Sequence, residues 1–387
     1  MKNETVTVMG VGDIILDAPD TDRFFDRARK TLQSADFAVG NIEAPHTDRP
    51  MWCNVEPHSA PAASPKNLPA VARAGINVAT IGGNHCFDQG AYGILDAIDI
   101  LKSNGTAVCG AGRNIDEARK PAIVESRGVK LAFLHYNLTG PRECYASAMK
   151  TGCAYVRIST AYCNERAEPG GSPTLIYTVA DPRTRQDMVD DIRAAQEKAN
   201  CVIVYFHSGR PGSPELMQYE TELTHLCIDV GVQMVLCCHT HALSSVEVYR
   251  GKPIFYGLGN FVTVTGAMNR DAENARQRHT NPYAWPGIVP YWEYDPFAKL
   301  EPVGIPYYPF AEFSRNTMIA KAEFTKDGLQ SAGFIPCYIN DCAQPEPVTR
   351  SRKGEDVVEY LADWTRRAGL DTKFRWNDLG TEIVLEL

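Results

Sequence analysis

The chain has 387 residues and a formal net charge of −8, with 44% hydrophobic and 22% charged residues. This composition is ordinary for a globular protein with a large core. The acidic balance argues against general nucleic-acid binding, which needs a basic face to neutralise phosphates. A small anionic substrate held by a few local charges is not excluded.

The N-terminal stretch MKNETVTVMGVGDIIL lacks a basic segment followed by an unbroken apolar run, so no secretion signal is expected. No run of about 18 apolar residues occurs, so no transmembrane helix is expected either. The twelve cysteines are scattered without a CxxC pair, which argues against a structural zinc knot and favours reduced thiols. We therefore expect a soluble, cytoplasmic protein.

Apolar runs rich in β-branched residues alternate with amphipathic stretches along the chain, which predicts an α/β fold. The runs expected to form strands are 5–11, 37–39, 76–81, 129–134, 201–206, 232–237, 245–249, 253–256, 318–324 and 329–339. The stretches expected to form helices are 24–34, 68–74, 92–103, 187–199, 219–230 and 355–367. We expect one domain over 1–387, ending in a strand and helix extension over 313–387.

A long segment at 265–312 interrupts the alternation and carries most of the late prolines and aromatic residues. A loop of this length in a compact domain is usually functional, and its aromatic content argues against disorder. We interpret it as an insert that forms either a lid over the substrate or a dimer contact. As a lid it would contact the substrate through Trp285 and Tyr291, with Tyr283 and Trp292 beside them.

Polar side chains recur where the expected strands end. Ligands bind outside the carboxyl ends of the strands in an open α/β sheet, so these residues should converge on one edge. A single residue of these types at the end of a strand usually forms a turn, caps a helix or makes an ordinary hydrogen bond. Turns alone are not expected to place so many of them after successive strands of an α/β fold. The residues are Asp13, Asn41, Glu43, Asn84, His85, His207, His239 and His241.

This mixture of carboxylates, amide oxygen and imidazoles suits a divalent transition metal better than calcium, which prefers oxygen ligands. His239 and His241 are separated by one residue, so they can chelate one metal or face two neighbouring ones. We expect one or two ions, with manganese, zinc or iron favoured. A P-loop and a G-x-S-x-G nucleophile elbow are absent from the sequence.

Three further residues are candidates for substrate contact. Arg210 follows His207, and its planar guanidinium suits a carboxylate or phosphate, although a surface arginine is more often only solvated. Asn260 follows Gly259 after a strand, a pair that is usually a turn. The third candidate is Asn41, which would contact either the substrate or the metal.

The chain resembles the CapA-type (poly-γ-glutamate capsule synthesis) proteins of the calcineurin-like metallophosphoesterase superfamily, from GVGDIIL to about residue 339. The matching segments are GDIIL, FAVGNIEAP, AGINVATIGGNHCFDQGAYGILDAIDIL, VIVYFHSG, HTH and GKPIFYGLGNFV. The resemblance implies a four-layer αββα sandwich, in which helices flank two mixed β-sheets and a metal site lies at the sheet edge.

The resemblance also implies roles for these residues. Asp13 and His241 would bind the first metal, and Glu43 would lie between the two metals. The implied ligands of the second metal are Asn84, His207 and His239. His85 matches the superfamily histidine that acts on the leaving group, and Asp88 would orient it through a hydrogen bond or serve only as a loop cap.

Several features depart from the family pattern. Ile15 stands where the wider superfamily has a metal-binding histidine, which implies a weak or empty first site. HSGRP at 207–211 replaces His-Trp-Gly-x-Glu, and CCHTH at 237–241 replaces Gly-His-His-Pro-His. Many members carry an N-terminal membrane anchor, and we expect none in this sequence. These differences indicate a shift in substrate, away from an extracellular capsule role.

Metal-activated water would be the nucleophile of such a hydrolase, with His85 protonating the leaving group. The CapA resemblance favours an amide or γ-glutamyl-type bond in a small polar, anionic or peptide-like substrate. The superfamily favours a phosphoester instead. A non-catalytic component of poly-γ-glutamate synthesis, or a binding protein, is the third alternative. A homo-oligomer is left open, and no nucleic-acid or membrane-spanning role is expected.

Overall fold

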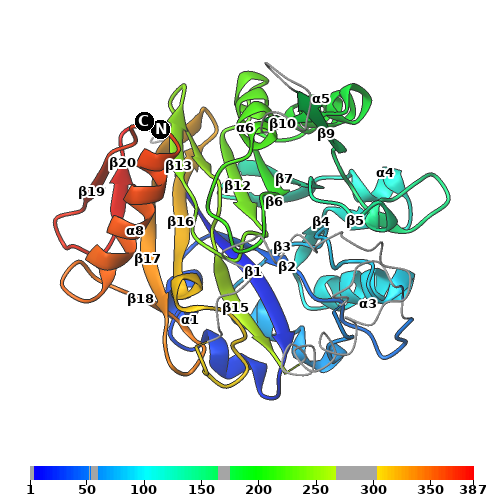
Figure 1. Cartoon of the computed structure of the whole chain (residues 1–387), viewed down its shortest axis with the longest axis horizontal. Helices are drawn as coiled ribbons and strands as arrows, with labels where there is room; N and C mark the ends of the chain where they lie inside the picture. Colours follow the sequence, from blue (N-terminus) through cyan, green and yellow to red (C-terminus); the bar gives the residue numbers. More distant parts are fainter. Residues whose placement is uncertain (1–3, 52, 54–59, 164–174, 267–302) are drawn as a thin grey trace, which may run out of the picture.

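The computed structural model describes residues 4–51, 53, 60–163, 175–266 and 303–387, and two large β-sheets form its centre (Figure 1). The larger sheet runs in the order β19 (Phe374–Trp376), β20 (Ile383–Leu385), β17 (Gly328–Ile339), β16 (Asn316–Thr325), β1 (Val6–Asp17), β2 (Phe37–Ile42), β3 (Val78–Thr80) and β4 (Ala107–Cys109). Two more strands join it, β15 (Asn260–Thr265) beside β1 and β18 (Pro345–Pro347) beside β17.

The smaller sheet runs in the order β13 (Val246–Tyr249), β14 (Lys252–Phe255), β12 (Met234–Cys238), β11 (Cys201–His207), β7 (Val129–Asn137) and β6 (Ala122–Ser126). Two small ribbons pair β5 (Ala111–Gly112) with β8 (Gly152–Cys153), and β9 (Ile158–Cys163) with β10 (Leu175–Ala180). Strands β1 to β4 are mutually parallel, and so are β7, β11, β12 and β14. Their carboxyl ends therefore gather polar residues from distant parts of the sequence.

Side-chain alternation decides what each sheet face buries. In β12, Met234 and Cys238 belong to the apolar cluster between the two sheets. Val235 and Cys237 belong to the cluster on the outer face, beneath the helices. Both sheets follow this pattern, so the molecule has a helix, sheet, sheet and helix layering. The expected four-layer αββα arrangement is confirmed.

Helices cover the outer faces of both sheets. The larger sheet packs on α1 (Arg29–Leu32), α2 (Ala70–Arg73) and α3 (Gly90–Ser103). The smaller sheet packs on α4 (Ile115–Ala118), α5 (Pro182–Gln196) and α6 (Gln218–Asp229). Helix α8 (Gly354–Arg367) lies alongside β17 (Figure 1). Short 3-10 turns are η1 (Thr21–Phe25), η2 (Pro65–Asn67), η3 (Arg142–Cys144) and η5 (Glu312–Arg315).

One expected helix differs from the structure. The helix expected over 24–34 is instead η1, a turn and the short helix α1. Phe24 and Phe25 are adjacent and both buried, and backbone bonds of i→i+3 spacing tighten the chain around them. The segment 313–387 supplies β16 and β17, which extend the sheet that contains β1. Within the described residues, no helix is long and apolar enough to cross a membrane.

Candidate metal centre

Asp13 lies at a bulge in β1, where the register with β2 and with β15 shifts. A Cβ atom at Gly12 would lie 1.8 Å from the carbonyl oxygen of Gly259, so only glycine permits this close approach. The same carbonyl accepts a hydrogen bond from the backbone N–H of Asp13 at 3.1 Å. The turn that precedes β15 therefore fixes the backbone that presents the Asp13 carboxylate.

Two donors hold that carboxylate. Asn41 Nδ2 donates to Asp13 Oδ1 at 2.9 Å, and the backbone N–H of His239 donates to Oδ2 at 2.9 Å. The Thr80 hydroxyl donates to Asn41 Oδ1 at 3.0 Å, which sets the orientation of the amide. Asn41 is fully buried, so its contacts favour a role in orienting Asp13 over contact with a substrate.

Glu43 follows β2 and is almost fully buried. Both of its carboxylate oxygens lack a hydrogen-bond partner among the residues that the structure describes. The nearest basic group is His241, whose Nε2 lies 3.4 Å from Glu43 Oε1. A buried carboxylate without hydrogen bonds is costly, so this position suits a bound cation.

The two histidines after β12 have unusual backbone geometry. His239 has φ of 100° and His241 has φ of 53°, both in the left-handed region that non-glycine residues rarely adopt. Strain of this kind persists where the surrounding structure enforces it, commonly at functional sites. Within the described part of the chain, His239 Nδ1 is buried without a hydrogen-bond partner. Both rings are thus held close to Asp13 and Glu43.

Asn260, the first residue of β15, sets the orientation of the His241 ring. Its Oδ1 lies 2.8 Å from His241 Nδ1, and its Nδ2 lies 3.4 Å from the hydroxyl of Tyr308. If Nδ1–H donates to this amide oxygen, Nε2 carries the lone pair that a metal needs. The ring of Phe310 packs 4.6 Å from that of His241, centroid to centroid. The end of the 265–312 insert therefore borders the site.

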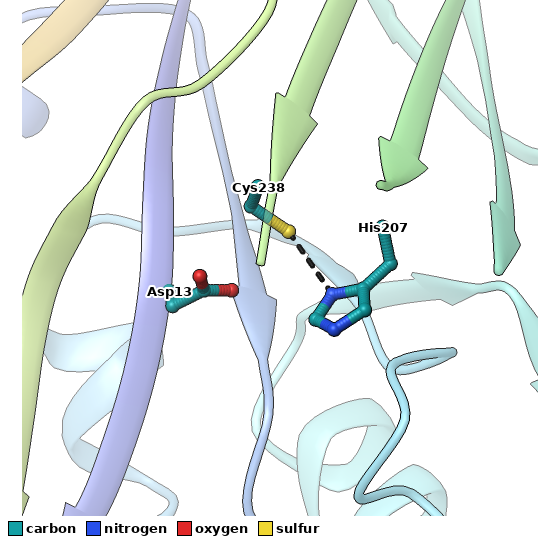
Figure 2. Close-up of side chains that lie close together, drawn as sticks. All are labelled: Asp13, His207 and Cys238. Carbon is teal, nitrogen blue, oxygen red and sulfur yellow. Dashed lines mark hydrogen bonds between the residues drawn. The ribbon is translucent and has the colours of Figure 1, made fainter. Parts of the chain in front are cut away.

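His207 ends β11 and has a different partner at each ring nitrogen. Its Nε2 lies 2.8 Å from Asn84 Oδ1, and its Nδ1 lies 3.3 Å from the sulfur of Cys238. Figure 2 shows His207 and Cys238 entering from neighbouring strand ends and facing the Asp13 carboxylate. The ring can therefore offer a nitrogen toward Asn84 or toward Cys238.

Three overlapping sets of side chains bring their donor atoms within 4.8 Å of one another. The sets are Asp13, Glu43 and His241; Glu43, His207 and His239; and Asp13, His207 and Cys238. Asp13, Glu43 and His207 each belong to two of the sets. Asp13 from within β1, two residues that end strands (His207 and Cys238) and three from the loops after β2 and β12 (Glu43, His239 and His241) thus supply donors to one small region.

The charges in this region are strongly coupled. Burial and the nearby Glu43 raise the pKa of Asp13, whereas the attraction of His241 outweighs burial and lowers the pKa of Glu43. Burial opposes the charge on His241, but Glu43 raises its pKa to about 9. Burial and His241 lower the pKa of His239 to about 3. At neutral pH without a cation, His241 is the protonated member of the pair.

His85 and Asp88 form a dyad beside the donors. His85 Nδ1 lies 2.7 Å from Asp88 Oδ2, which also accepts a hydrogen bond from the backbone of Ala60 at 2.5 Å. Asp88 is fully buried, whereas the His85 side chain is 19% exposed. The charge of His85 helps to lower the pKa of Glu43, after the larger effects of burial and His241.

The sequence profile of the family described as "Bacterial capsule synthesis protein PGA_cap" matches residues 7–265. The chain belongs to this family. It is 26% identical over 271 residues to "Capsule biosynthesis protein CapA" of Bacillus anthracis, which covers 67% of this chain and 60% of that protein. It is 22% identical over 270 residues to "PGA biosynthesis protein CapA" of Bacillus subtilis, with 67% and 64% covered.

A third relative is named "Probable polyglutamine synthesis accessory protein", from Mycobacterium tuberculosis, and is 28% identical over 205 residues, with 51% of this chain and 48% of that protein covered. The chain therefore spans less than two thirds of the length of each of these relatives. Among solved structures, TT1561 of Thermus thermophilus aligns with a TM-score of 0.36 and 13% identity over 66% of this chain and 90% of its own.

The other residues expected at the site of this PGA_cap member have different surroundings. Arg210 lies on the loop after β11 and donates to the Ser213 hydroxyl at 3.1 Å and to Glu215 at 3.4 Å. Ile15 is half-buried in β1 and offers no donor atom. The residues expected in a lid lie outside the described part of the chain: Tyr283, Trp285, Tyr291 and Trp292.

Sequence reasoning missed two residues of the site. Cys238 directly precedes His239, and strand alternation already placed it on the inner face of β12. His135, near the end of β7, accepts a hydrogen bond from the backbone N–H of Gly82 at 3.2 Å and so supports the loop that carries Asn84. Burial lowers the pKa of His135 to about 3, which keeps it a neutral acceptor. His135 and Gly82 lie far apart in the sequence, so no local pattern around either residue predicts their contact.

Proposed function

We propose that this PGA_cap member is a metal-dependent hydrolase that cleaves an amide or γ-glutamyl-type bond in a small polar or anionic substrate. The observation that carries the proposal is the cluster of buried donor atoms around Glu43. Both Glu43 oxygens and His239 Nδ1 lack hydrogen-bond partners among the described residues, although they are buried. Buried polar atoms are normally satisfied, so a bound cation accounts for them.

The donors present fit one or two divalent transition-metal ions. Asp13, Glu43 and His241 would hold one ion, and Glu43 would also contribute to the other. The remaining ligands of that second ion would be Asn84, His207 and His239. When bound, such an ion would lower the pKa of a water molecule towards about 7 and polarise a carbonyl or phosphoryl oxygen.

The His85–Asp88 dyad supplies the proton for the leaving group in this proposal. The buried Asp88 carboxylate accepts a hydrogen bond from Nδ1 of His85, which fixes the orientation of the ring and stabilises the imidazolium. An imidazolium held in this way can transfer the Nε2 proton to a departing amine or alkoxide. Its partial exposure allows it to regain a proton from solvent.

The names of the relatives support the substrate class. Two Bacillus relatives are described by capsule or PGA biosynthesis, and the family profile is described by capsule synthesis. We therefore include in the proposal a role in the metabolism of poly-γ-glutamate-type chains, whose repeating bond is an amide. The guanidinium of Arg210 would recognise a carboxylate of such a chain.

A phosphoesterase is the second candidate function. Its support is the overlap of the donor sets: Asp13, Glu43 and His207 each belong to two of them, so the cluster offers donors for two neighbouring ions. Paired metals a few ångströms apart are typical of enzymes that cleave phosphoesters. The same dyad would then protonate a departing alkoxide.

Turnover by the full chain loaded with manganese or zinc tests the proposal. The probes are γ-glutamyl-p-nitroanilide, oligomers of γ-linked glutamate and p-nitrophenyl phosphate. We expect release of amine from the first two, and loss of that activity in His85→Gln. A matched control is His225→Gln, because His225 also pairs with a carboxylate, Glu247, at 2.9 Å but lies on α6.

Preferred hydrolysis of the phosphate probe would favour the phosphoesterase. Metal binding without turnover of any probe would favour a non-catalytic accessory role, in keeping with the name of the mycobacterial relative.

A further inference from the structure

Cys238 is a thiol inside the donor cluster. It ends β12 and points into the space between the sheets, and it is fully buried, as are Asp13 and His207. One oxygen of Asp13, one nitrogen of His207 and the sulfur of Cys238 all lie within 4.8 Å of one another (Figure 2). The neighbouring Cys237 lies on the other face of the strand, beneath the helices.

The spacing of these atoms suits a shared metal ion. In a tetrahedral zinc site with Zn–N of about 2.0 Å and Zn–S of about 2.3 Å, the nitrogen and sulfur lie roughly 3.5 Å apart. The sulfur of Cys238 lies 3.3 Å from Nδ1 of His207. Few rotations are therefore needed to bring both atoms onto one ion.

The polar neighbours of these three residues leave room for this ligand set. Asn41 Nδ2 contacts Asp13 Oδ1 at 2.9 Å and His207 Nδ1 at 3.5 Å, and the backbone N–H of His239 contacts Asp13 Oδ2. Each carboxylate oxygen has a second lone pair, so these hydrogen bonds do not prevent Asp13 from binding a metal.

We propose that Cys238 is a sulfur ligand of a metal ion shared with Asp13 and His207, and that it makes the centre prefer zinc or cobalt to manganese or magnesium. This inference rests on the proposed metal-dependent function and specifies which metal serves it. It places His207 on the same ion as Asp13 through Nδ1, in place of the assignment of His207 to the ion beside Asn84. On binding, the thiol releases its proton to solvent and the sulfur bonds to the ion as a thiolate. Soft thiolate ligands favour zinc, whereas magnesium and manganese favour oxygen.

The proposal specifies which ring nitrogen of His207 binds the metal. An ion bound at Nδ1 of His207 lies on the Cys238 side, while an ion bound at Nε2 lies on the Asn84 side. Only the first arrangement places sulfur next to the metal. The bond to sulfur can be detected directly, so the test does not depend on finding a substrate.

The experiment loads the full chain with cobalt or with zinc, in the wild type, Cys238→Ser and Cys237→Ser. We expect a near-ultraviolet sulfur-to-cobalt charge-transfer band in the wild type and in Cys237→Ser, but not in Cys238→Ser. Zinc X-ray absorption of the wild type should show a sulfur neighbour at about 2.3 Å. The ratio of zinc affinity to manganese affinity should fall at least about tenfold in Cys238→Ser.

The outcomes separate this inference from the proposed function. Zinc bound with only nitrogen and oxygen neighbours at about 2.0–2.2 Å would overturn the role of Cys238 and leave the hydrolase proposal standing. No metal bound by the wild type would overturn both. The wild-type absorption spectrum decides the question even if Cys238→Ser does not fold. A band that persists in folded Cys238→Ser would assign the sulfur to another cysteine and refute the inference.

Discussion

Nδ1 of His241, in the loop after β12 of the smaller sheet, lies 2.8 Å from Oδ1 of Asn260, at the start of β15 in the larger sheet. This contact turns Nε2 toward Glu43, 3.4 Å away. Asn260 pairs in register with Asp13 of β1, so the same strand positions two members of the donor cluster. A residue expected to form a turn or touch a substrate is thus placed to select the ring tautomer.

Replacing Asn260 with alanine should weaken metal binding without unfolding the chain. The ring of His241 would lose the acceptor that fixes its tautomer and orientation, a loss that typically costs about 10–100-fold in metal affinity. Competition with a chromophoric chelator measures the affinity. Asn67→Ala is the control, because the Asn67 amide also bonds the chain beside β1, at Leu16 and Ala18, but makes no contact with His241. Equal affinities in the two variants would refute the role of Asn260.

The sequence predicted the convergence of the donors because parallel strands share one carboxyl edge. Asp13, Asn84, His207 and His239 all follow apolar runs that the structure shows as strands or strand ends. Strand β15 was not predicted. Its pairing with β1 joins segments almost 250 residues apart, and the local pattern at 259–260 is also that of an ordinary turn.

The roles of the less obvious polar residues also depended on tertiary contacts. Asn41 is oriented by the hydroxyl of Thr80 on the neighbouring strand, and His135 supports the loop at Gly82 from the other sheet. Cys238 differs from them, because alternation along β12 together with the adjacent histidines could have placed it. The sequence therefore predicted the donors at strand ends better than the residues that orient them.

Asp88→Asn should reduce turnover while metal content stays at the wild-type level. The amide keeps the acceptor for the backbone of Ala60 but removes the charge that stabilises the His85 imidazolium. General acid catalysis is typically worth about 10²–10⁴-fold, and we expect the loss to approach the lower end, with the acidic form of His85 lost at a lower pH. Rates on γ-glutamyl-p-nitroanilide across pH measure both effects. An unchanged pH profile together with unchanged rate would contradict the dyad.

Metal binding should release protons at neutral pH. His241 has a pKa raised to about 9 by Glu43, so below that pH its proton competes with the metal. Apparent affinity should fall about tenfold for each unit that pH drops below this value, since one proton is displaced. The raised pKa of Asp13 adds a second proton at more acidic pH.

Calorimetric titration in buffers of different ionisation enthalpy counts these protons. The expected result at pH 7.5 is the release of about one proton from His241 for each metal bound at that site, beyond any from Cys238. The His241→Gln variant should release fewer. A heat of binding independent of the buffer would show that His241 is already neutral before the metal arrives.

Glu220 provides a pH-dependent stability that is separate from the donor cluster. It is buried in the first turn of α6, where it accepts hydrogen bonds from the Ser208 hydroxyl at 3.2 Å and from the backbone of Met217 at 2.9 Å. Burial raises its pKa to about 7 from an ordinary value of 4.5. The folded chain therefore holds this proton more tightly than the unfolded chain does.

The sign of the effect follows from that difference. Below pH 4.5 both states are protonated and the stability is fully present. As pH rises towards 7, the unfolded state ionises first, so the free energy of unfolding falls by of order 3 kcal/mol in total. Glu220→Gln cannot ionise, and its free energy of unfolding should exceed that of the wild type by more at pH 8 than at pH 5.

Chemical denaturation of the metal-free chain at the two pH values measures this difference. Glu222→Gln is the matched control, because Glu222 lies on the same helix but is partly exposed and pairs with Arg185 at 3.0 Å. The difference in free energy of unfolding between Glu222→Gln and the wild type should change little between pH 5 and pH 8, since exposed ion pairs contribute about 0–1 kcal/mol. The raised pKa of Glu220 would be refuted if the free energy of unfolding of Glu220→Gln, relative to the wild type, changed as little between pH 5 and pH 8 as that of Glu222→Gln. Glu220 would then ionise near its ordinary pKa, with water or a cation reaching it behind the loop at 207–213.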